Sequence, residues 1–308
     1  MALADKARLG YPLPQVFIDG AVDLNLIRTI AEGAERYGFD SLWDQEQTLG
    51  HASALEPVSL LSAAAAMTST VKLGVSVLVM ARHDPVQLAK ELASVDQLSG
   101  GRLIVGVGAG NRDVAPSVEG TPKDRRLLRL AEGVEVMKAL WADGTATFAG
   151  KIWRLTDAPM NPKPAQRPHP PIWFGARAEP AIRRAVRHGD GWMGAGSSTA
   201  DDFDEQLGLL RQVLESEGRD PATFAVSKRV YIAIDDDSAR AERRLREWFG
   251  AYYGNVEMAS RVSVWGPERI VQERLAAVAD AGAEMILVSP VYDYVEHQEA
   301  LASMWGMA

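Results

Sequence analysis

Short apolar runs alternate with longer amphipathic segments along almost the whole chain, and this alternation restricts the fold more than any other feature. Several runs are apolar throughout, which is typical of strands that are buried on both faces of a parallel sheet. Eight strand–helix units with right-handed crossovers predict a (β/α)8 barrel, with a doubly wound open sheet as the alternative. The predicted strands are Arg8–Leu13, Ser41–Asp44, Val71–Met80, Leu103–Ala109, Ile172–Ala176, Gly191–Ala195, Ala225–Ile234 and Met285–Val291.

The segments between these runs carry the marks of helices. Apolar residues recur every three or four positions from Leu24 to Ala34, and Gly38 ends the pattern. Asp84 before Pro85 has the form of an N-cap followed by proline at the first helical position. We therefore expect helices in the gaps between the strands.

No domain boundary interrupts the alternation. The stretch richest in proline, Pro159–Pro171, lies within it and is expected to form a loop between two units. A length of 308 residues is usual for one α/β barrel. We expect a single domain over residues 1–308.

The balance of charges and the absence of cysteine exclude several classes of function. The chain has 33 Lys and Arg against 41 Asp and Glu, a formal net charge of −8, which argues against a nucleic acid or an anionic membrane as partner. No disulfide or thiolate metal site is available, and the five histidines lack the spacing of a helical zinc motif, so we expect no metal. Because the first ten residues lack the apolar core of a signal peptide, we expect a cytoplasmic protein.

Two loops after neighbouring predicted strands have the composition of an anion site. Gly175-Ala176-Arg177 leads into a helix near Pro180, and free amides at a helix N-terminus together with an arginine bind anions. Gly194-Ala195-Gly196-Ser197-Ser198 adds small residues and hydroxyls that suit the same ligand. Together they suggest a phosphate site, although each alone is also typical of an ordinary N-cap and turn.

Other candidate residues follow the second, third and fourth predicted strands. Gly106–Asn111 is rich in glycine, which permits a ligand to approach the backbone; the alternative is a glycine-rich strand end at a barrel rim. Its spacing is not a dinucleotide fingerprint. Glu46 would lie on the catalytic face of a barrel, or in a solvated acidic loop. His83 is expected in a strand-to-helix turn, and the alternative is that it lines the site.

These residues resemble the luciferase-like monooxygenase family over nearly the whole chain, particularly its branch that uses the deazaflavin coenzyme F-420. Single pieces are weak signals, but their order and spacing together are specific. The resemblance rests on Gly38-Phe39-Asp40-Ser41-Leu42-Trp43, Leu73–Leu78, Leu98–Gly110, Leu140-Trp141, Gly150, Pro162-Lys163-Pro164, Pro170–Arg177, Asp190-Gly191-Trp192 and Gly266-Pro267-Glu268.

The resemblance implies a luciferase-like TIM barrel with insertions that forms a homodimer and holds its cofactor on the C-terminal face. It implies a bulge with a non-prolyl cis peptide at Ser76-Val77, so that Ser76, Val77 and Leu78 lie behind the cofactor ring. It also implies that the cofactor phosphate binds at Gly175–Arg177 and Gly194–Ser198, with Asn111 near the cofactor. The anionic tail of the coenzyme would meet Lys228, Arg229 or the basic helix face around Arg183.

The chain departs from the family at two positions. Relatives commonly have Asp-His after the second strand, where this chain has Glu46-Gln47, and glutamine cannot exchange a proton as an imidazole does. Asn111 stands where some deazaflavin dehydrogenases have a carboxylate. Glu46 therefore remains as the candidate catalytic residue, for a polar or proton-transferring role.

Three functional hypotheses follow. The first is an F-420-dependent oxidoreductase that moves a hydride between the coenzyme and a small organic substrate. The second is an FMN-dependent monooxygenase on the same fold, and the third is a flavin-binding or deazaflavin-binding protein without catalysis. We expect the substrate to be recognised by the loops Asn111–Pro122 and Tyr252–Val264.

Overall fold

A computed structural model describes residues 3–110 and 125–307 of the chain. Eight parallel strands pair in chain order, and the pairing of β10 with β11 closes them into a barrel. This confirms the predicted barrel over the open sheet, and every predicted strand agrees with the observed one to within a residue at each end. The barrel strands are β1 (Arg8–Pro12), β3 (Ser41–Asp44), β5 (Lys72–Val79), β6 (Leu103–Gly108), β9 (Ile172–Gly175), β10 (Gly191–Gly194), β11 (Ala225–Ile234) and β13 (Met285–Pro290).

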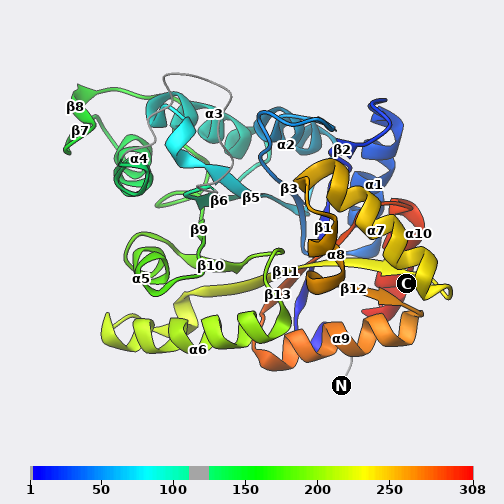
Figure 1. Ribbon diagram of the computed structural model, residues 1–308. Helices are drawn as coiled ribbons and strands as arrows, with labels where there is room; N and C mark the ends of the chain where they lie inside the picture. Colours follow the sequence, from blue (N-terminus) through cyan, green and yellow to red (C-terminus); the bar gives the residue numbers. More distant parts are fainter. Residues whose placement is uncertain (1–2, 111–124, 308) are drawn as a thin grey trace.

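Helices surround the strands on the outside (Figure 1). The predicted signals lie where expected: the Asp23 side chain caps α1, Gly38 ends it in the left-handed conformation, and Asp84 caps α3 ahead of Pro85. The described helices are α1 (Leu24–Tyr37), α2 (Pro57–Met67), α3 (Pro85–Leu98), α4 (Arg126–Trp141), α5 (Glu179–His188), α6 (Ala200–Ser216), α7 (Ser238–Tyr253), α8 (Val256–Val262), α9 (Glu268–Ala281) and α10 (Tyr294–Met304), with 3-10 turns η1 (Leu3–Asp5), η2 (Met80–Arg82) and η3 (Pro221–Thr223).

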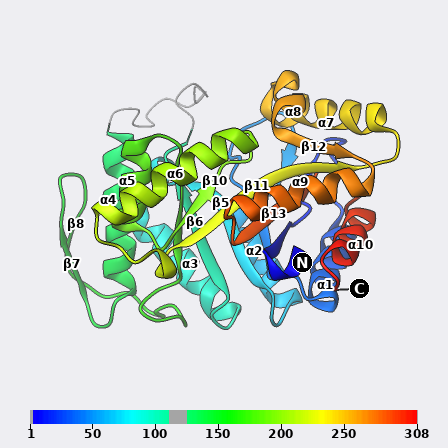
Figure 2. The ribbon, with the colours of Figure 1, turned by 90° about the horizontal axis from the view of Figure 1, so that it is seen from below.

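Several short elements were not predicted. The hairpin of β7 (Ala146–Ala149) and β8 (Arg154–Ala158) extends from the body of the barrel beyond α4 (Figures 1 and 2). Strands β2 (Val16–Phe17) and β4 (Ser53–Ala54) form a second small sheet. After β11 the chain forms α7, α8 and a ninth parallel strand, β12 (Ser263–Gly266), before it returns to the barrel helices. The expected substrate loop Tyr252–Val264 therefore contains helix α8.

Large side chains fill the inside of the barrel, so it is a packed core and not a pore. Gly74 makes this packing possible, because a Cβ there would lie 2.4 Å from the ring of Trp43. The Trp43 and Trp173 rings pack at 5.6 Å between centroids. The interior cluster consists of Trp43, Ile104, Trp173, Met193, Met285 and Leu287, with Val77 and Ala225 packed against it.

Strand β5 contains the bulge that the family resemblance implies. Its register with β6 shifts between Val75 and Leu78, and the Ser76–Val77 peptide bond is cis, as predicted. The shift changes the side-chain alternation: Val77 packs against the barrel interior, whereas Leu78 is buried in the core beneath the helices. Of the three residues expected behind a cofactor ring, Ser76 and Val77 are half-buried and Leu78 is fully buried.

Candidate active site at the barrel mouth

The C-terminal ends of β5, β6 and β9 pack closely together, because glycines there leave no room for a side chain. A Cβ on Gly106 would lie 1.9 Å from the carbonyl oxygen of Val75, and one on Gly108 would lie 2.7 Å from the Val77 side chain. A Cβ on Gly175 would be 3.3 Å from Val77. The glycine-rich strand end therefore packs closely against the β5 bulge, and Val77 is the side chain in contact with both neighbouring glycines.

The two predicted anion loops come together beside β11. Arg177, which is exposed after β9, donates a hydrogen bond from Nη2 to Oγ of Ser197 in the second loop. From β11, Lys228 donates to the carbonyl oxygens of Ala195 and Ser198 at 2.6 and 2.8 Å. We call residues 175–177 and 194–198 with Lys228 the anion loop site. It combines two cations, and within residues 3–110 and 125–307 neither forms a salt bridge.

The charges of this site are unbalanced. Lys228 is only 3% exposed. Burial and the nearby Arg177 charge lower its pKa to about 7, although Asp202 acts in the opposite direction. Asp202 itself accepts a hydrogen bond from the backbone N–H of Thr199 in the capping box of α6, which lowers its pKa. A buried cation without a bound counterion is costly, so this region favours an anionic ligand.

The basic face of α5 is engaged elsewhere. Arg183 forms ion pairs with Glu179 and Glu217 at 2.9 and 2.8 Å, and Arg187 bonds to the same Glu217. These contacts satisfy the guanidinium groups on the helix surface. Arg183 and Arg187 therefore already have carboxylate partners, and the expectation that this face meets an anionic tail stays a prediction.

Arg229 lies next to Lys228 on β11 but joins the barrel mouth instead. Its Nη1 donates to Oε1 of Gln45 at 2.5 Å and to the carbonyl oxygen of Ser76 at 3.2 Å, and its Nε donates to Oγ of Ser289 at 3.2 Å. Tyr231 also donates to Gln45 Oε1, at 3.3 Å. Arg229 thus ties the ends of β3, β5 and β13 together around a small cavity of about 20 Å³, room for a single water.

Glu46 is paired with a histidine from the next strand end. Its Oε2 lies 2.9 Å from Nε2 of His83 and accepts the backbone N–H of Val79 at 2.6 Å, while Thr48 donates to Oε1 at 3.0 Å. Burial raises the pKa of Glu46, but these hydrogen bonds outweigh it and the pKa lies below its ordinary value. Burial lowers the pKa of His83, and the Glu46 carboxylate outweighs that effect and raises it. An imidazole is therefore present at the mouth. It belongs to His83, between η2 and α3, and not to position 47, where relatives commonly have histidine and this chain has Gln47.

Two polar side chains near this pair have unused bonding capacity. Both carboxyl oxygens of Asp44, which is 1% exposed, and Oε1 of Gln47 are buried without a hydrogen-bond partner among the described residues. Burial, with a contribution from Glu56, raises the pKa of Asp44 well above its ordinary value, although the nearby Arg229 charge acts in the opposite direction. Nε2 of Gln47 donates to the backbone oxygen of Tyr252 at 3.0 Å. The end of α7 therefore closes over this side of the mouth.

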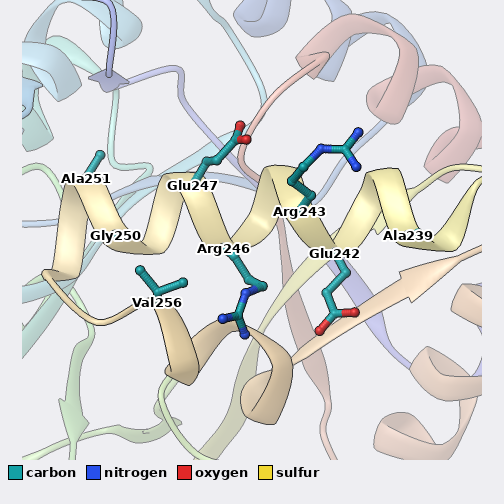
Figure 3. A pocket seen from close by; sticks show the side chains of 8 residues that line it. All are labelled: Ala239, Glu242, Arg243, Arg246, Glu247, Gly250, Ala251 and Val256. Carbon is teal, nitrogen blue, oxygen red and sulfur yellow. The ribbon is translucent and has the colours of Figure 1, made fainter.

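A larger groove of about 520 Å³ lies on the outer side of α7 and α8, away from the strand ends (Figure 3). Figure 3 shows Glu242 and Arg246 pointing toward α8 and Arg243 and Glu247 pointing away from it. Arg246 pairs with Glu257, and Ser260 donates to Glu242 at 2.6 Å. Glu242 and Arg246, the two groove charges that face α8, are therefore already bonded to residues of that helix.

Asn111 and the whole of the loop Asn111–Pro122 lie outside the described residues. Within residues 3–110 and 125–307 no cluster of His, Asp and Glu has metal-binding geometry. In the same part of the chain, no helix has both the length and the apolar character to cross a bilayer.

Comparisons with known proteins identify the group to which this architecture belongs. A family model described as luciferase-like monooxygenase matches residues 10–288. An F-420-dependent glucose-6-phosphate dehydrogenase from Kineococcus radiotolerans is 33% identical over 70% of this chain and 66% of its own. An FMNH(2)-dependent dimethylsulfone monooxygenase from Pseudomonas putida is 32% identical over 71% of this chain and 61% of its own. These matches leave about a third or more of each relative uncovered.

Solved structures share the fold at lower sequence identity. An F-420-dependent secondary alcohol dehydrogenase, in complex with an F-420–acetone adduct, superposes with a TM-score of 0.82 at 20% identity and covers 98% of this chain and 99% of its own. An F-420-dependent tetrahydromethanopterin reductase from Methanopyrus kandleri gives a TM-score of 0.78 at 18% identity, with 97% and 98% covered. At these identities the likeness establishes the barrel with its insertions.

Proposed function

The chain belongs to the luciferase-like monooxygenase family, and we propose that it is an oxidoreductase that binds coenzyme F-420 at the barrel mouth and moves a hydride between the coenzyme and a small organic substrate. The observation that carries this proposal is the anion loop site, where Arg177 and the buried Lys228 stand beside each other without a carboxylate partner among the described residues. The F-420-dependent relatives favour the deazaflavin as the ligand.

The residues of the anion loop site suit the phosphate of a tricyclic cofactor. Arg177 and the backbone of residues 194–198 would hold the phosphate, because the loops supply hydroxyls, small residues and a positive charge. Val77, half-buried in front of Gly108 and Gly175, would support one face of the ring. The bound coenzyme supplies the hydride chemistry, and the protein supplies binding, orientation and electrostatics.

The Glu46–His83 pair is our candidate for holding the proton that accompanies hydride transfer. Nε2 of His83 faces the Glu46 carboxylate, and within the described residues Nδ1 has no bond, so Nδ1 is the atom at which a proton would be exchanged. The His83 side chain is 25% exposed, which leaves that exchange open to substrate or water. Glu46 then orients the ring and stabilises its charged form, an arrangement suited to general acid–base catalysis.

FMN is the second candidate cofactor. It carries a phosphate on the same kind of tricycle, and the Pseudomonas putida relative is FMNH(2)-dependent by name. The anion loop site would serve either phosphate. If FMN is the cofactor, the protein would be a monooxygenase that requires a reductase.

A fluorescence titration of the purified protein with F-420 and, separately, with FMN tests the proposal. We expect micromolar binding of F-420, with FMN at least about tenfold weaker, which corresponds to about 1.4 kcal/mol. Tighter binding of FMN than of F-420 would favour the second candidate function, a monooxygenase, over hydride transfer. Binding of neither would overturn the proposed function and leave the fold and family unaffected.

A further inference from the structure

The ammonium group of Lys228 sits among uncharged oxygen atoms. Its three contacts are the carbonyl oxygens of Ala195 and Ser198, at 2.6 and 2.8 Å, and the hydroxyl of Ser198 at 2.7 Å. The ring of Phe203 lies 5.7 Å away on the side of α6. Three acceptors match the three N–H groups of a protonated lysine. Because these acceptors belong to the second anion loop, Lys228 fixes the backbone of that loop from beneath.

A neutral lysine amine satisfies the same atoms in a different way. It has two N–H groups and one lone pair, so it can serve both carbonyl oxygens only if the Ser198 hydroxyl turns to donate to Nζ. That hydroxyl now donates to the Ala195 carbonyl at 2.7 Å, a bond that the change would break. The charge-assisted character of the lysine bonds would be lost as well. The arrangement of the loop therefore depends on the proton at Nζ.

The charged groups around Lys228 make this proton sensitive to a bound anion. Arg177, on the connection from β9, disfavours a second positive charge, and Asp202, at the start of α6, favours it. With burial added, the pKa of Lys228 is about 7, so the protonated and neutral forms have similar free energies near neutral pH. A phosphate beside Arg177 would offset the repulsion and attract the proton to Lys228.

We propose that Lys228 is a positioning residue for the anion loop site, and that an anion which binds this loop draws a proton from solvent onto Nζ of Lys228. One N–H bond forms as the buffer gives up a proton, and no covalent bond within the ligand changes. The inference rests on the proposed function only for the identity of the anion, a phosphate of a deazaflavin or flavin. The loop then presents two positive charges to the phosphate, Arg177 in contact and Lys228 behind the backbone.

The test separates the phosphate from the ring. Affinities are measured by fluorescence at about pH 7 and about pH 9 for two matched pairs, F-420 with its phosphate-free riboside and FMN with riboflavin. The ratio within a pair is called the phosphate advantage; for F-420 it also contains the contribution of the anionic tail, whose carboxylates are ionised at both pH values. The phosphate of FMN is a monoester that is already doubly ionised above about pH 7, and the phosphate of F-420 is a diester that carries one charge throughout this range. A guanidinium does not lose its proton in proteins, and hydrogen bonds lower the pKa of Asp202, so the test follows the titration of Lys228.

In the wild-type protein we expect the phosphate advantage to fall by about tenfold or more between the two pH values, up to a limit of about tenfold per pH unit. Lys228→Met should show a small advantage that does not vary with pH. Lys228→Arg, which keeps its charge, should retain an advantage that no longer falls at the higher pH. A wild-type advantage independent of pH, or an unchanged fall in Lys228→Met, would overturn the inference.

Proton uptake gives a second readout that needs no variant. Calorimetric titration in two buffers of different ionisation enthalpy should show close to half a proton taken up per phosphorylated ligand near pH 7, and much less with the riboside. If neither pair binds, the proposed function fails. Inorganic phosphate then decides the role of Lys228: an upward shift of the Lys228 titration midpoint in NMR supports the inference, and an unmoved midpoint contradicts it.

Discussion

Lys228 and Arg229 are neighbours on β11 and both are buried cations, yet they act on opposite sides of the sheet. Lys228 points outward to the loop at residues 195–198, whereas Arg229 points into the barrel mouth and bonds to the ends of β3, β5 and β13. Strand alternation sends consecutive side chains to opposite faces. Strand β11 thus supports both the anion loop site and the frame of the mouth.

The two cations also differ chemically. A guanidinium remains charged at any accessible pH and has a rigid set of donors, which suits Arg229 to a permanent tie among three strands. A lysine changes its charge readily when buried, and the pKa of Lys228 is lowered to about 7. We infer that the charge of Arg229 at the barrel mouth stays constant, and that the charge of Lys228 in the anion loop site changes when a ligand binds.

The largest change in the free energy of unfolding is expected at Arg229, which holds the ends of three strands together at the barrel mouth. Arg229→Met removes the donors to Gln45, Ser76 and Ser289 and leaves these acceptors without them, so the free energy of unfolding should fall by about 2–3 kcal/mol. Urea unfolding measures this change. Arg229→Lys is the matched control: it keeps the charge but cannot reach all three acceptors, and should recover only part of the loss. Full stability in Arg229→Met would show that the frame does not depend on Arg229.

On the other side of β11, the expected effect is on binding. Arg177→Ala should weaken cofactor binding by about 1–3 kcal/mol through loss of a charge-assisted hydrogen bond, with little change in stability because Arg177 is exposed. Fluorescence titration measures the affinity. Arg183→Ala is the control, since Glu179 and Glu217 already pair with Arg183, and it should bind the cofactor like the wild type. Equal affinities for all three proteins would remove Arg177 from the site.

A smaller change in the free energy of unfolding is expected at the Glu46–His83 pair. His83→Gln should lower the free energy of unfolding by about 1 kcal/mol, because the Glu46 carboxylate loses a partly buried cation. A urea-unfolding series against pH measures it, and Glu46→Gln with the double variant completes a thermodynamic cycle.

The sign of the pH dependence follows from the two shifts. The lowered pKa of Glu46 contributes stability above its unfolded value of about 4.3, which is lost as pH falls through the folded pKa. The raised pKa of His83 contributes stability below its unfolded value of about 6.5, which is lost as pH rises through the folded pKa. The difference between wild type and His83→Gln should therefore be largest between about pH 4.3 and 6.5. A difference that does not vary with pH would contradict the pairing.

The sequence predicts the barrel well because the relevant signals are local. Apolar runs bounded by caps such as Asp84 and Gly38 fix the elements, and the carboxyl ends of parallel strands must share one edge. For the same reason the sequence predicts that the loops at Gly175–Arg177 and Gly194–Ser198 are neighbours. The contact of Arg177 with Ser197 agrees with that expectation.

The remaining features depend on contacts between distant residues. The bulge in β5 changes the side-chain alternation within one strand, so the burial of Leu78 does not follow from the pattern of apolar residues. His83 reaches Glu46 across 37 residues, which no spacing rule specifies. A signal for the two cations was available: Lys228-Arg229 interrupts an otherwise largely apolar predicted strand, and charges in such a place require partners.

A crystal structure of the protein with bound F-420 tests the central claim most directly. The account predicts the coenzyme at the barrel mouth, with its phosphate within hydrogen-bond distance of Arg177 and of the backbone at residues 194–198, and with its ring beside Val77. A coenzyme seated with its phosphate away from these loops, for example in the groove on the outer side of α7 and α8 (Figure 3), would contradict it.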